Sequence, residues 1–145
     1  MSNKKRKSNY TEDKISTMSC NKKKPYGYEL IMDLHGCNAE KFTREDLNEF
    51  FIKLCELIKM QRCELYFWDD VGVPIEEQQT SPHTKGTSAV QFILTSSIVI
   101  HTLDLMEAVY INIFSCNYFD ENVALEFTKK WFSSNECISH YIKRI

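Results

Sequence analysis

The chain has 145 residues, of which 43% are hydrophobic and 12% aromatic, and its formal net charge is −2. This length and composition predict one globular domain with a sizeable core. The sequence has no apolar run that spans a bilayer, no secretory signal after its basic N-terminus and no zinc-finger spacing among its six cysteines. We therefore expect a cytoplasmic protein with reduced thiols, no metal site and no membrane partner.

Residues 1–24 are basic, with eight lysine and arginine residues against two acidic ones. Such a segment can bind nucleic acid or an anionic surface. It is also polar, lacks apolar periodicity and precedes an acidic body that would repel phosphate. We therefore expect a disordered, solubilising tail and no nucleic-acid partner, with a single domain over residues 25–145.

Residues 26–60 predict a strand followed by a helix. The strand YGYELIMDLHGC (26–37) ends at Gly36. The helix TREDLNEFFIKLCELIKM (43–60) has Thr43 as its N-cap and acidic residues in its first turn. One apolar stripe runs along it at helical spacing: Leu47, Phe50, Phe51, Leu54, Leu57 and Ile58.

A strand, CELYFW (63–68), precedes a polar loop over residues 69–87 that is rich in Gly, Pro and acidic residues. A loop of this length in a small domain is usually functional or disordered. Three further strands are predicted at 88–95, 97–103 and 108–116. Their short connections favour antiparallel pairing.

A second helix is predicted over residues 120–132, with Asp120 as its cap and two lysines at its negative end. Its apolar side holds Val123, Phe127 and Trp131. A short last strand is expected at 137–142. The order of elements predicts an α/β (α+β) fold, a two-layer sandwich of a mainly antiparallel sheet with two helices on one face.

The stretch GTSAVQFILTSSIVIHTLDLMEAVYINIFSC (86–116) contains four spaced polar residues. Ser88 lies two residues after Gly86, Ser96 lies eight residues further on, His101 five further in an IHT, and Cys116 fifteen further still. This pattern resembles the self-processing core of the small bacterial, archaeal and phage-type S-adenosylmethionine decarboxylases. The order of the surrounding elements also resembles that family, over about residues 26–135.

The resemblance implies a pyruvoyl-dependent decarboxylase of polyamine biosynthesis that makes its own cofactor. Ser96 would attack the preceding carbonyl, and elimination from the resulting ester would cut the chain between Thr95 and Ser96, leaving a pyruvoyl group. His101 would then transfer protons, and Ser88 would hydrogen-bond the tetrahedral intermediate. The pyruvoyl carbonyl would form a Schiff base with the substrate amine, and Cys116 would protonate the carbon that loses CO2.

The choice of serine and the direction of the side chains in this stretch depend on the three-dimensional structure. Ser97 lies beside Ser96, and only the five-residue interval to His101 favours Ser96 as the precursor. Ser96 and His101 are also an odd number of residues apart, so a regular strand would place them on opposite faces. We therefore expect a bend or an irregularity near residue 96.

The sequence departs from the family at the positions that contact substrate. Thr95 stands where the family has Glu, and LDL follows IHT where the family has WPE, so Leu105 replaces a glutamate that binds ribose hydroxyls. Leucine cannot accept hydrogen bonds from a diol. The substrate therefore stays open between S-adenosylmethionine and a smaller cationic amino acid, ornithine or arginine. A catalytically inactive regulatory paralogue is a third interpretation.

An amino acid with a terminal cation needs a carboxylate partner. Spacing does not choose among five candidates: Asp33, Asp69, Asp70, Asp104 and Glu107.

The strand at 108–116 carries large apolar residues on both faces. Val109, Ile111 and Ile113 point one way, and Tyr110 and Phe114 point the other. Helices on one side of the sheet would leave the other apolar face exposed, so we expect a homodimer of αβ units.

Overall fold

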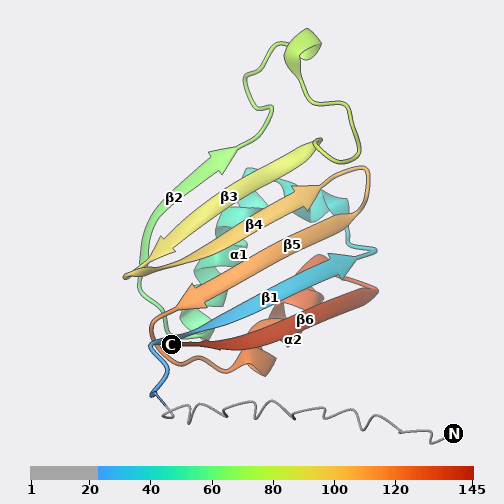
Figure 1. The fold of residues 1–145 in the computed structure, drawn as a ribbon. Coiled ribbons are helices and arrows are strands. Elements are labelled where there is room, and N and C mark those ends of the chain that lie inside the picture. The colour runs from blue at the N-terminus through green and yellow to red at the C-terminus, as the bar shows by residue number, and fades with distance from the viewer. Residues whose placement is uncertain (1–22) are drawn as a thin grey trace, which may run out of the picture.

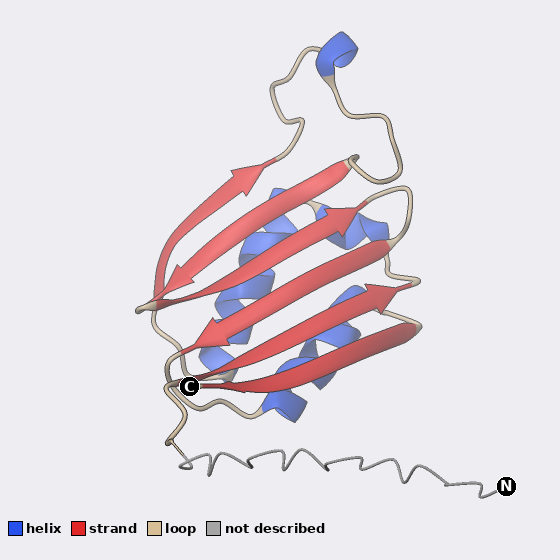
Figure 2. Ribbon diagram, in the orientation of Figure 1, coloured by secondary structure: helices blue, strands red, loops and turns tan. Residues whose placement is uncertain are grey.

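One antiparallel sheet with helices on a single face forms the body of the molecule (Figures 1 and 2). The computed structural model describes residues 23–145, so the prediction of a disordered basic tail lies outside the described residues except for the last two residues of that segment. The sheet has the order β2-β3-β4-β5-β1-β6. Helices α1 (Arg44–Leu57) and α2 (Glu121–Phe132) lie behind it in Figure 1. This arrangement confirms the predicted two-layer fold.

The strands agree with the predicted order and differ at their ends. Their bounds are β1 Gly27–His35, β2 Arg62–Trp68, β3 Gly86–Ile93, β4 Ser96–Leu103, β5 Ala108–Ser115 and β6 Glu136–Arg144. Short 3-10 helices occupy Ala39–Phe42 and Ile75–Glu77. The last strand is longer than predicted because it pairs along the whole of β1, from Gly27↔Arg144 to His35↔Glu136.

Both predicted helix caps are present. The Thr43 hydroxyl accepts a hydrogen bond from the backbone N–H of Asp46 at 3.1 Å. The Asp120 carboxylate accepts hydrogen bonds from the N–H groups of Asn122 at 2.9 Å and Val123 at 3.3 Å. Each cap satisfies helix donors that would otherwise lack a partner, which fixes where α1 and α2 begin.

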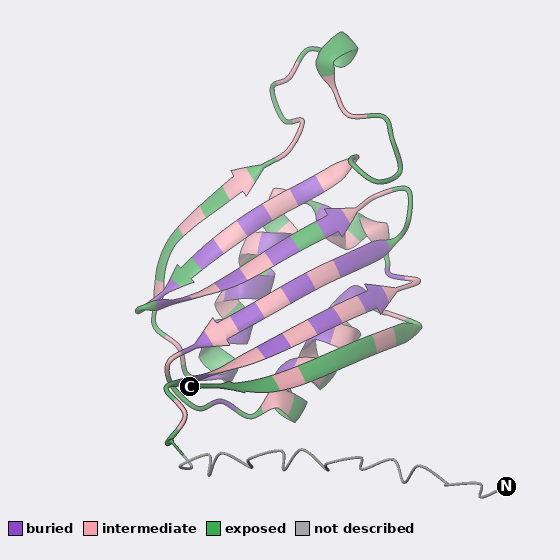
Figure 3. Ribbon diagram, in the orientation of Figure 1, coloured by how far each residue is buried: buried purple, intermediate pink, exposed green. Residues whose placement is uncertain are grey.

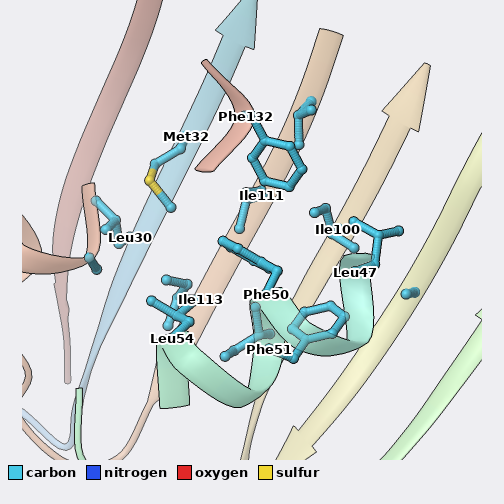
Figure 4. Close-up of a cluster of buried hydrophobic side chains, with 14 of the residues drawn as sticks. Leu30, Met32, Leu47, Phe50, Phe51, Leu54, Ile100, Ile111, Ile113 and Phe132 are labelled. Carbon is cyan, nitrogen blue, oxygen red and sulfur yellow. The ribbon is translucent and has the colours of Figure 1, made fainter. Parts of the chain in front are cut away.

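The core lies between the helices and the sheet (Figure 4). Phe50 of α1 is fully buried, and its ring centroid lies 5.1 Å from that of Phe132 in α2. The predicted stripe on α1 is correct except for Leu57, which is 45% exposed because the helix ends there. The predicted side of α2 was wrong at Val123, since this helix packs through a neighbouring stripe. That buried stripe holds Ala124, Thr128 and Phe132.

The other face of the sheet has no helix over it in the part of the chain that the structure describes (Figure 3). Along β4 the even-numbered residues from Ser96 are buried against the helices, while Ser97, Val99 and His101 point away from them. This uncovered face carries large apolar side chains that are exposed to solvent: Tyr66, Trp68, Phe92, Ile138 and Ile142.

The buried aromatic cluster around Phe50 should dominate stability. Phe50→Ala removes a fully buried ring and is expected to lower the free energy of unfolding by about 3–5 kcal/mol. Leu57→Ala, on the same helix but largely exposed, should cost less than about 1 kcal/mol. Urea denaturation followed by circular dichroism measures both. Equal losses in the two variants would contradict this description of the core.

Candidate active site

A strained turn precedes Ser96. Strands β3 and β4 pair up to Ile93↔Ser96, so only Leu94 and Thr95 form the turn between them. Thr95 has φ of 55°, in the left-handed region. This conformation is unfavourable for a β-branched residue and is normally taken by Gly, Asn or Asp in such turns. Backbone strain is therefore concentrated in the residue directly before Ser96.

The Ser96 side chain is held in place by the end of β5. Ser96 is only 9% exposed, and its Oγ accepts a hydrogen bond from the backbone N–H of Cys116 at 3.0 Å. Because Cys116 directly follows β5, the strand beside β4, the sheet itself brings these two residues together. The hydroxyl therefore has a fixed position one peptide bond from the strained Thr95.

The Cys116 thiol contacts the same turn. Its Sγ lies 3.2 Å from the Thr95 Oγ1, and that hydroxyl also donates to the backbone carbonyl of Leu94 at 2.8 Å. A hydroxyl can turn its proton toward sulfur when the thiol ionises, which favours the thiolate. Hydrogen bonds from Thr95 and then Ser96 accordingly hold the pKa of Cys116 below the ordinary value for a thiol.

Ser88 and His101 form a second pair on neighbouring strands. They lie directly opposite each other in the β3–β4 register, and the Ser88 Oγ is 2.8 Å from the His101 Nδ1. Both side chains are on the uncovered face. Since this contact uses Nδ1, the other ring nitrogen, Nε2, remains for proton transfer.

The two pairs do not meet within one chain. Strand β4 is regular from Ser96 to His101, with unbroken pairing to both neighbours, so the irregularity predicted near residue 96 does not lie within the strand. Five residues of strand separate the two side chains by about 17 Å and direct them to opposite faces. The irregularity is instead the turn at Thr95, before the strand begins.

Each pair borders its own hollow. A hollow of about 510 Å³ lies along Thr95, Ser96 and Ser97, and Phe92 and Phe114 form part of its wall. A second, of about 380 Å³, is bordered by the Ser88–His101 pair. Its further lining includes Trp68, His83, Leu103 and Tyr110.

Two of the candidate carboxylates, Asp69 and Asp70, hold the loop between β2 and β3 in place. Both oxygens of Asp69 accept hydrogen bonds from the guanidinium of Arg44, each at 2.6 Å, and this pairing lowers the pKa of Asp69. Asp70 accepts from the backbone N–H of Gln79 at 3.0 Å and lies 4.0 Å from the Lys85 ammonium. Both acids thereby fasten the loop and are already partnered.

The other candidates lie elsewhere. Asp104 lines the same hollow as Asp69 and Asp70, at the start of α1, where burial raises its pKa. Glu107 and Leu105 are exposed in the turn between β4 and β5. Asp33 lies on the uncovered face, in the row Asp33–Tyr110–His101 across β1, β5 and β4. None of the five lines the hollow beside Ser96.

Residues 23–145 contain no group of three or more His, Cys, Asp or Glu side chains arranged to hold a metal ion. Within the same range no helix is long and apolar enough to cross a membrane.

A cofactor made from a residue of the chain needs a precursor serine at a cleavable bond, and the turn at Thr95–Ser96 fits that need.

Comparison with known proteins agrees with the family resemblance and with the fold. The family model described as S-adenosylmethionine decarboxylase matches residues 28–145. The chain belongs to the S-adenosylmethionine decarboxylase family. No curated protein sequence gives a significant match.

A solved structure shares the fold of this S-adenosylmethionine decarboxylase-like chain. It is the crystal structure of the adenosylmethionine decarboxylase from Aquifex aeolicus VF5, with a TM-score of 0.66 and 17% sequence identity. The match covers 84% of this chain and 92% of that one. At this identity the likeness bears on the fold alone, and it agrees with the antiparallel sheet and two helices described above.

Sequence reasoning missed one acidic residue near Ser96. Glu64 lines the hollow beside Ser96. It lies inside the predicted strand 63–68, and strand alternation alone gave no reason to single it out.

The contact between Thr95 and Cys116 predicts a measurable shift in thiol reactivity. In an uncleaved Ser96→Ala background, adding Thr95→Val removes the hydroxyl that favours the thiolate, so the pKa of Cys116 should rise. Peptide-mapped alkylation as a function of pH should show the Cys116 midpoint moving to higher pH. Cys55, whose burial raises its pKa to about 11, should not change. An unmoved Cys116 midpoint would mean that the hydroxyl does not act on the thiol.

Proposed function

We propose that the chain is a self-processing, pyruvoyl-dependent decarboxylase of polyamine biosynthesis. One observation carries the proposal: the Ser96 hydroxyl, held by the Cys116 amide at 3.0 Å, directly follows a β-branched residue in the left-handed conformation. Membership of the S-adenosylmethionine decarboxylase family supports the reaction class.

The processing step uses groups of the chain itself. The Ser96 Oγ attacks the carbonyl carbon of Thr95, the C–N bond breaks, and a proton moves to the nitrogen to give an ester. Loss of the Ser96 Cα proton then breaks the ester C–O bond and releases Thr95 as a carboxylate. The remaining enamine takes up water and loses ammonia, leaving a pyruvoyl group on residue 96.

Strain and proton transfer make this chemistry accessible. A serine hydroxyl is a weak nucleophile and needs an adjacent base. The strain of the left-handed backbone at Thr95 is relieved when the peptide bond after it breaks. The folded precursor therefore already stores strain energy that lowers the barrier to this step. The base is His101, with Ser88 holding its ring.

His101 must come from a second copy of the chain, because its own Ser96 is about 17 Å away along the strand. The hollow that borders Thr95 and Ser96 lies beside Phe92 and Ser97 of the uncovered face, so a partner's sheet on that face can bring its His101 to this turn. We place the two-fold axis parallel to the uncovered face and perpendicular to its strands. The partner's sheet then packs on this face with its strands running in the opposite direction. This arrangement places the His101 end of the partner's sheet over the Ser96 end of this one. Val99, near the middle of β4, then lies near the axis.

The same dimer covers the apolar face. The row of side chains across the middle of that face includes the apolar residues Val90, Val99 and Ile31 together with the polar Asn112. Large apolar side chains lie on either side of this row. An exposed apolar surface of this kind usually marks an interface. In a two-fold dimer the same surface is used by both copies.

In the second reaction, Cys116 acts as the proton donor. The pyruvoyl group supplies an electron sink for the decarboxylation of an amino acid. The Cys116 thiol, beside residue 96, returns a proton to the carbon that loses CO2. Its lowered pKa lies nearer to neutrality than an ordinary thiol's, which suits proton transfer at physiological pH.

The choice of precursor serine is directly testable. Ser96→Ala should abolish cleavage, because the side chain next to the strained bond is lost. Ser97→Ala should still be cut, since that side chain lies on the uncovered face. Gel electrophoresis and N-terminal analysis separate the outcomes. A Ser96→Ala chain split after Thr95 would remove Ser96 from the mechanism.

The shared site predicts rescue between two inactive variants. Neither His101→Ala nor Ser96→Ala should be cleaved alone. When the two are co-expressed with different tags, the His101→Ala chain should be cut, because the partner's intact His101 reaches its Ser96. Co-expression with a Ser96→Ala/His101→Ala double variant is the control and should give no cleavage. A His101→Ala chain that stays whole in mixed dimers would contradict the shared site.

Substrate preference depends on the lost ribose-binding glutamate. Leu105 is 58% exposed in the β4–β5 turn and cannot pair with a diol. We expect S-adenosylmethionine to be a poorer substrate than ornithine or arginine when CO2 release from the labelled substrates is compared at equal concentration. Leu105→Glu should shift the preference back toward the nucleoside. A tenfold or larger preference of the wild-type protein for S-adenosylmethionine would show that the departures are tolerated.

A further inference from the structure

Strand β2 contains a bulge at its start, at the edge of the sheet (Figure 1). Arg62 pairs with Ile93 and Leu65 pairs with Gln91, so three steps along β2 match two along β3. Arg62 and Leu65 both lie opposite residues of the helix-covered face. The two residues between them, Cys63 and Glu64, therefore both point to the uncovered face, and both are exposed.

The bulge determines where Glu64 points. In a regular strand Glu64 would share the face of Arg62, two residues before it, and would point toward the helices. The extra residue moves its side chain to the opposite face, next to Phe92 and the hollow that borders Ser96. Bulges often re-aim a side chain beside an active site in this way.

A buried polar network supports the bulge. Gln91 is 0% exposed, and its amide donates hydrogen bonds to the backbone carbonyls of Cys63 at 3.1 Å and Glu64 at 3.2 Å. Its carbonyl oxygen accepts from the Arg62 Nε at 3.0 Å, and Arg62 Nη2 donates to Asn48 Oδ1 of α1 at 3.1 Å. The network supplies partners for carbonyls that the interrupted pairing leaves free, so the bulge is a built feature of the fold.

The Glu64 carboxylate has no hydrogen-bond or ion-pair partner within residues 23–145. Among the residues that line the hollow beside Ser96, Glu64 is the one acid in the described chain. Asp69 is paired with Arg44, and Asp70 and Asp104 line another hollow that Lys85 shares. A carboxylate without a partner therefore lines the hollow that borders Ser96.

We propose that Glu64 binds the positive charge on the substrate's side chain, and that Gln91 positions it. This inference rests on the proposed function. Each substrate considered above carries such a charge: a sulfonium in S-adenosylmethionine, an ammonium in ornithine and a guanidinium in arginine. Glu64 recognises an organic cation of any of these kinds.

Two aromatic rings complete the cation site. Phe92 and Phe114 line the same hollow, and aromatic faces attract cations. One face of Phe114 is already occupied by the guanidinium carbon of Arg144 at 5.6 Å, so the exposed ring of Phe92 is the more accessible of the two. In the proposed dimer the partner's sheet covers this hollow, which removes water and strengthens the charge pairing.

Matched amines test the charge recognition without turnover. The decarboxylated sulfonium amine of S-adenosylmethionine and its demethylated neutral thioether differ by one methyl group and its charge. The pair 1,4-diaminobutane and butylamine tests the ammonium in the same way. Calorimetry on the wild-type protein should show that the cation of at least one pair binds about tenfold more tightly than its neutral match, a factor typical of one charge-assisted contact.

Glu64→Gln should abolish this discrimination while leaving the affinity for the neutral amine and the cleavage of the chain unchanged. Glu56→Gln, an exposed glutamate on α1, is the matched control and should behave as wild type. Gln91→Met should reduce the discrimination as well, and adding it to Glu64→Gln should reduce it no further. A merely structural role for Gln91 would lower affinity for both members of a pair equally.

The outcomes separate the two proposals. Discrimination that persists in Glu64→Gln, or wild-type protein that binds neither cation, overturns the role of Glu64. The mass of the purified chain reports cleavage independently of binding. Uncleaved wild-type protein that still discriminates through Glu64 would leave this inference standing while the proposed function fails.

Discussion

The two-residue period of strand β4 governs the arrangement of the site. Ser96 and His101 lie on one regular strand an odd number of residues apart, so their side chains point to opposite faces. Strand β4 is paired with β3 and β5 along its whole length, so it cannot bend to bring Ser96 and His101 of one chain together. The helices cover one of these faces, and the other is apolar and uncovered. About 17 Å of strand separates the two residues, so a site that uses both requires a second copy of the chain. The hollow beside Thr95 and Ser96 adjoins the uncovered face, and the proposed dimer on that face satisfies the chemistry and the burial of apolar surface together.

The turn before β4 combines a structural cost with a chemical use. A Gly or Asn at residue 95 would relieve the left-handed backbone, yet the chain has Thr there. The Thr95 hydroxyl contacts the Cys116 sulfur at 3.2 Å, so the same residue places strain next to the bond that we propose is cut and holds the thiol beside it. The family resemblance gives Glu at this place. The smaller Thr retains a polar contact to the thiol without adding a charge beside it.

The sequence allowed the fold to be predicted because its local signals agree with one another. The caps at Thr43 and Asp120 and the stripe through Phe50 and Leu54 each depend on neighbours within a few residues. Leu57 was assigned to the core wrongly, because the last turn of a helix loses its packing where the chain leaves it.

Features that depend on pairing between strands could not be predicted. The bulge that redirects Glu64 is defined by how β2 pairs with β3, and no residue in CELYFW predicts it. Gln91, which supports the bulge, lies on the helix-covered face of β3, where the alternating pattern of a strand predicts an apolar residue. The pairing of Ser88 with His101 required the β3–β4 register, although the sequence pattern indicates both residues as site candidates.

The central claim is that the chain cuts itself before Ser96 and turns that residue into a pyruvoyl group. The intact mass of the purified wild-type protein, measured under denaturing conditions, tests it most directly. Self-processing should give two fragments, residues 1–95 and residues 96–145, the second lighter by one ammonia than the product of simple hydrolysis. A single intact chain would contradict self-processing and would favour an inactive, regulatory member of the family.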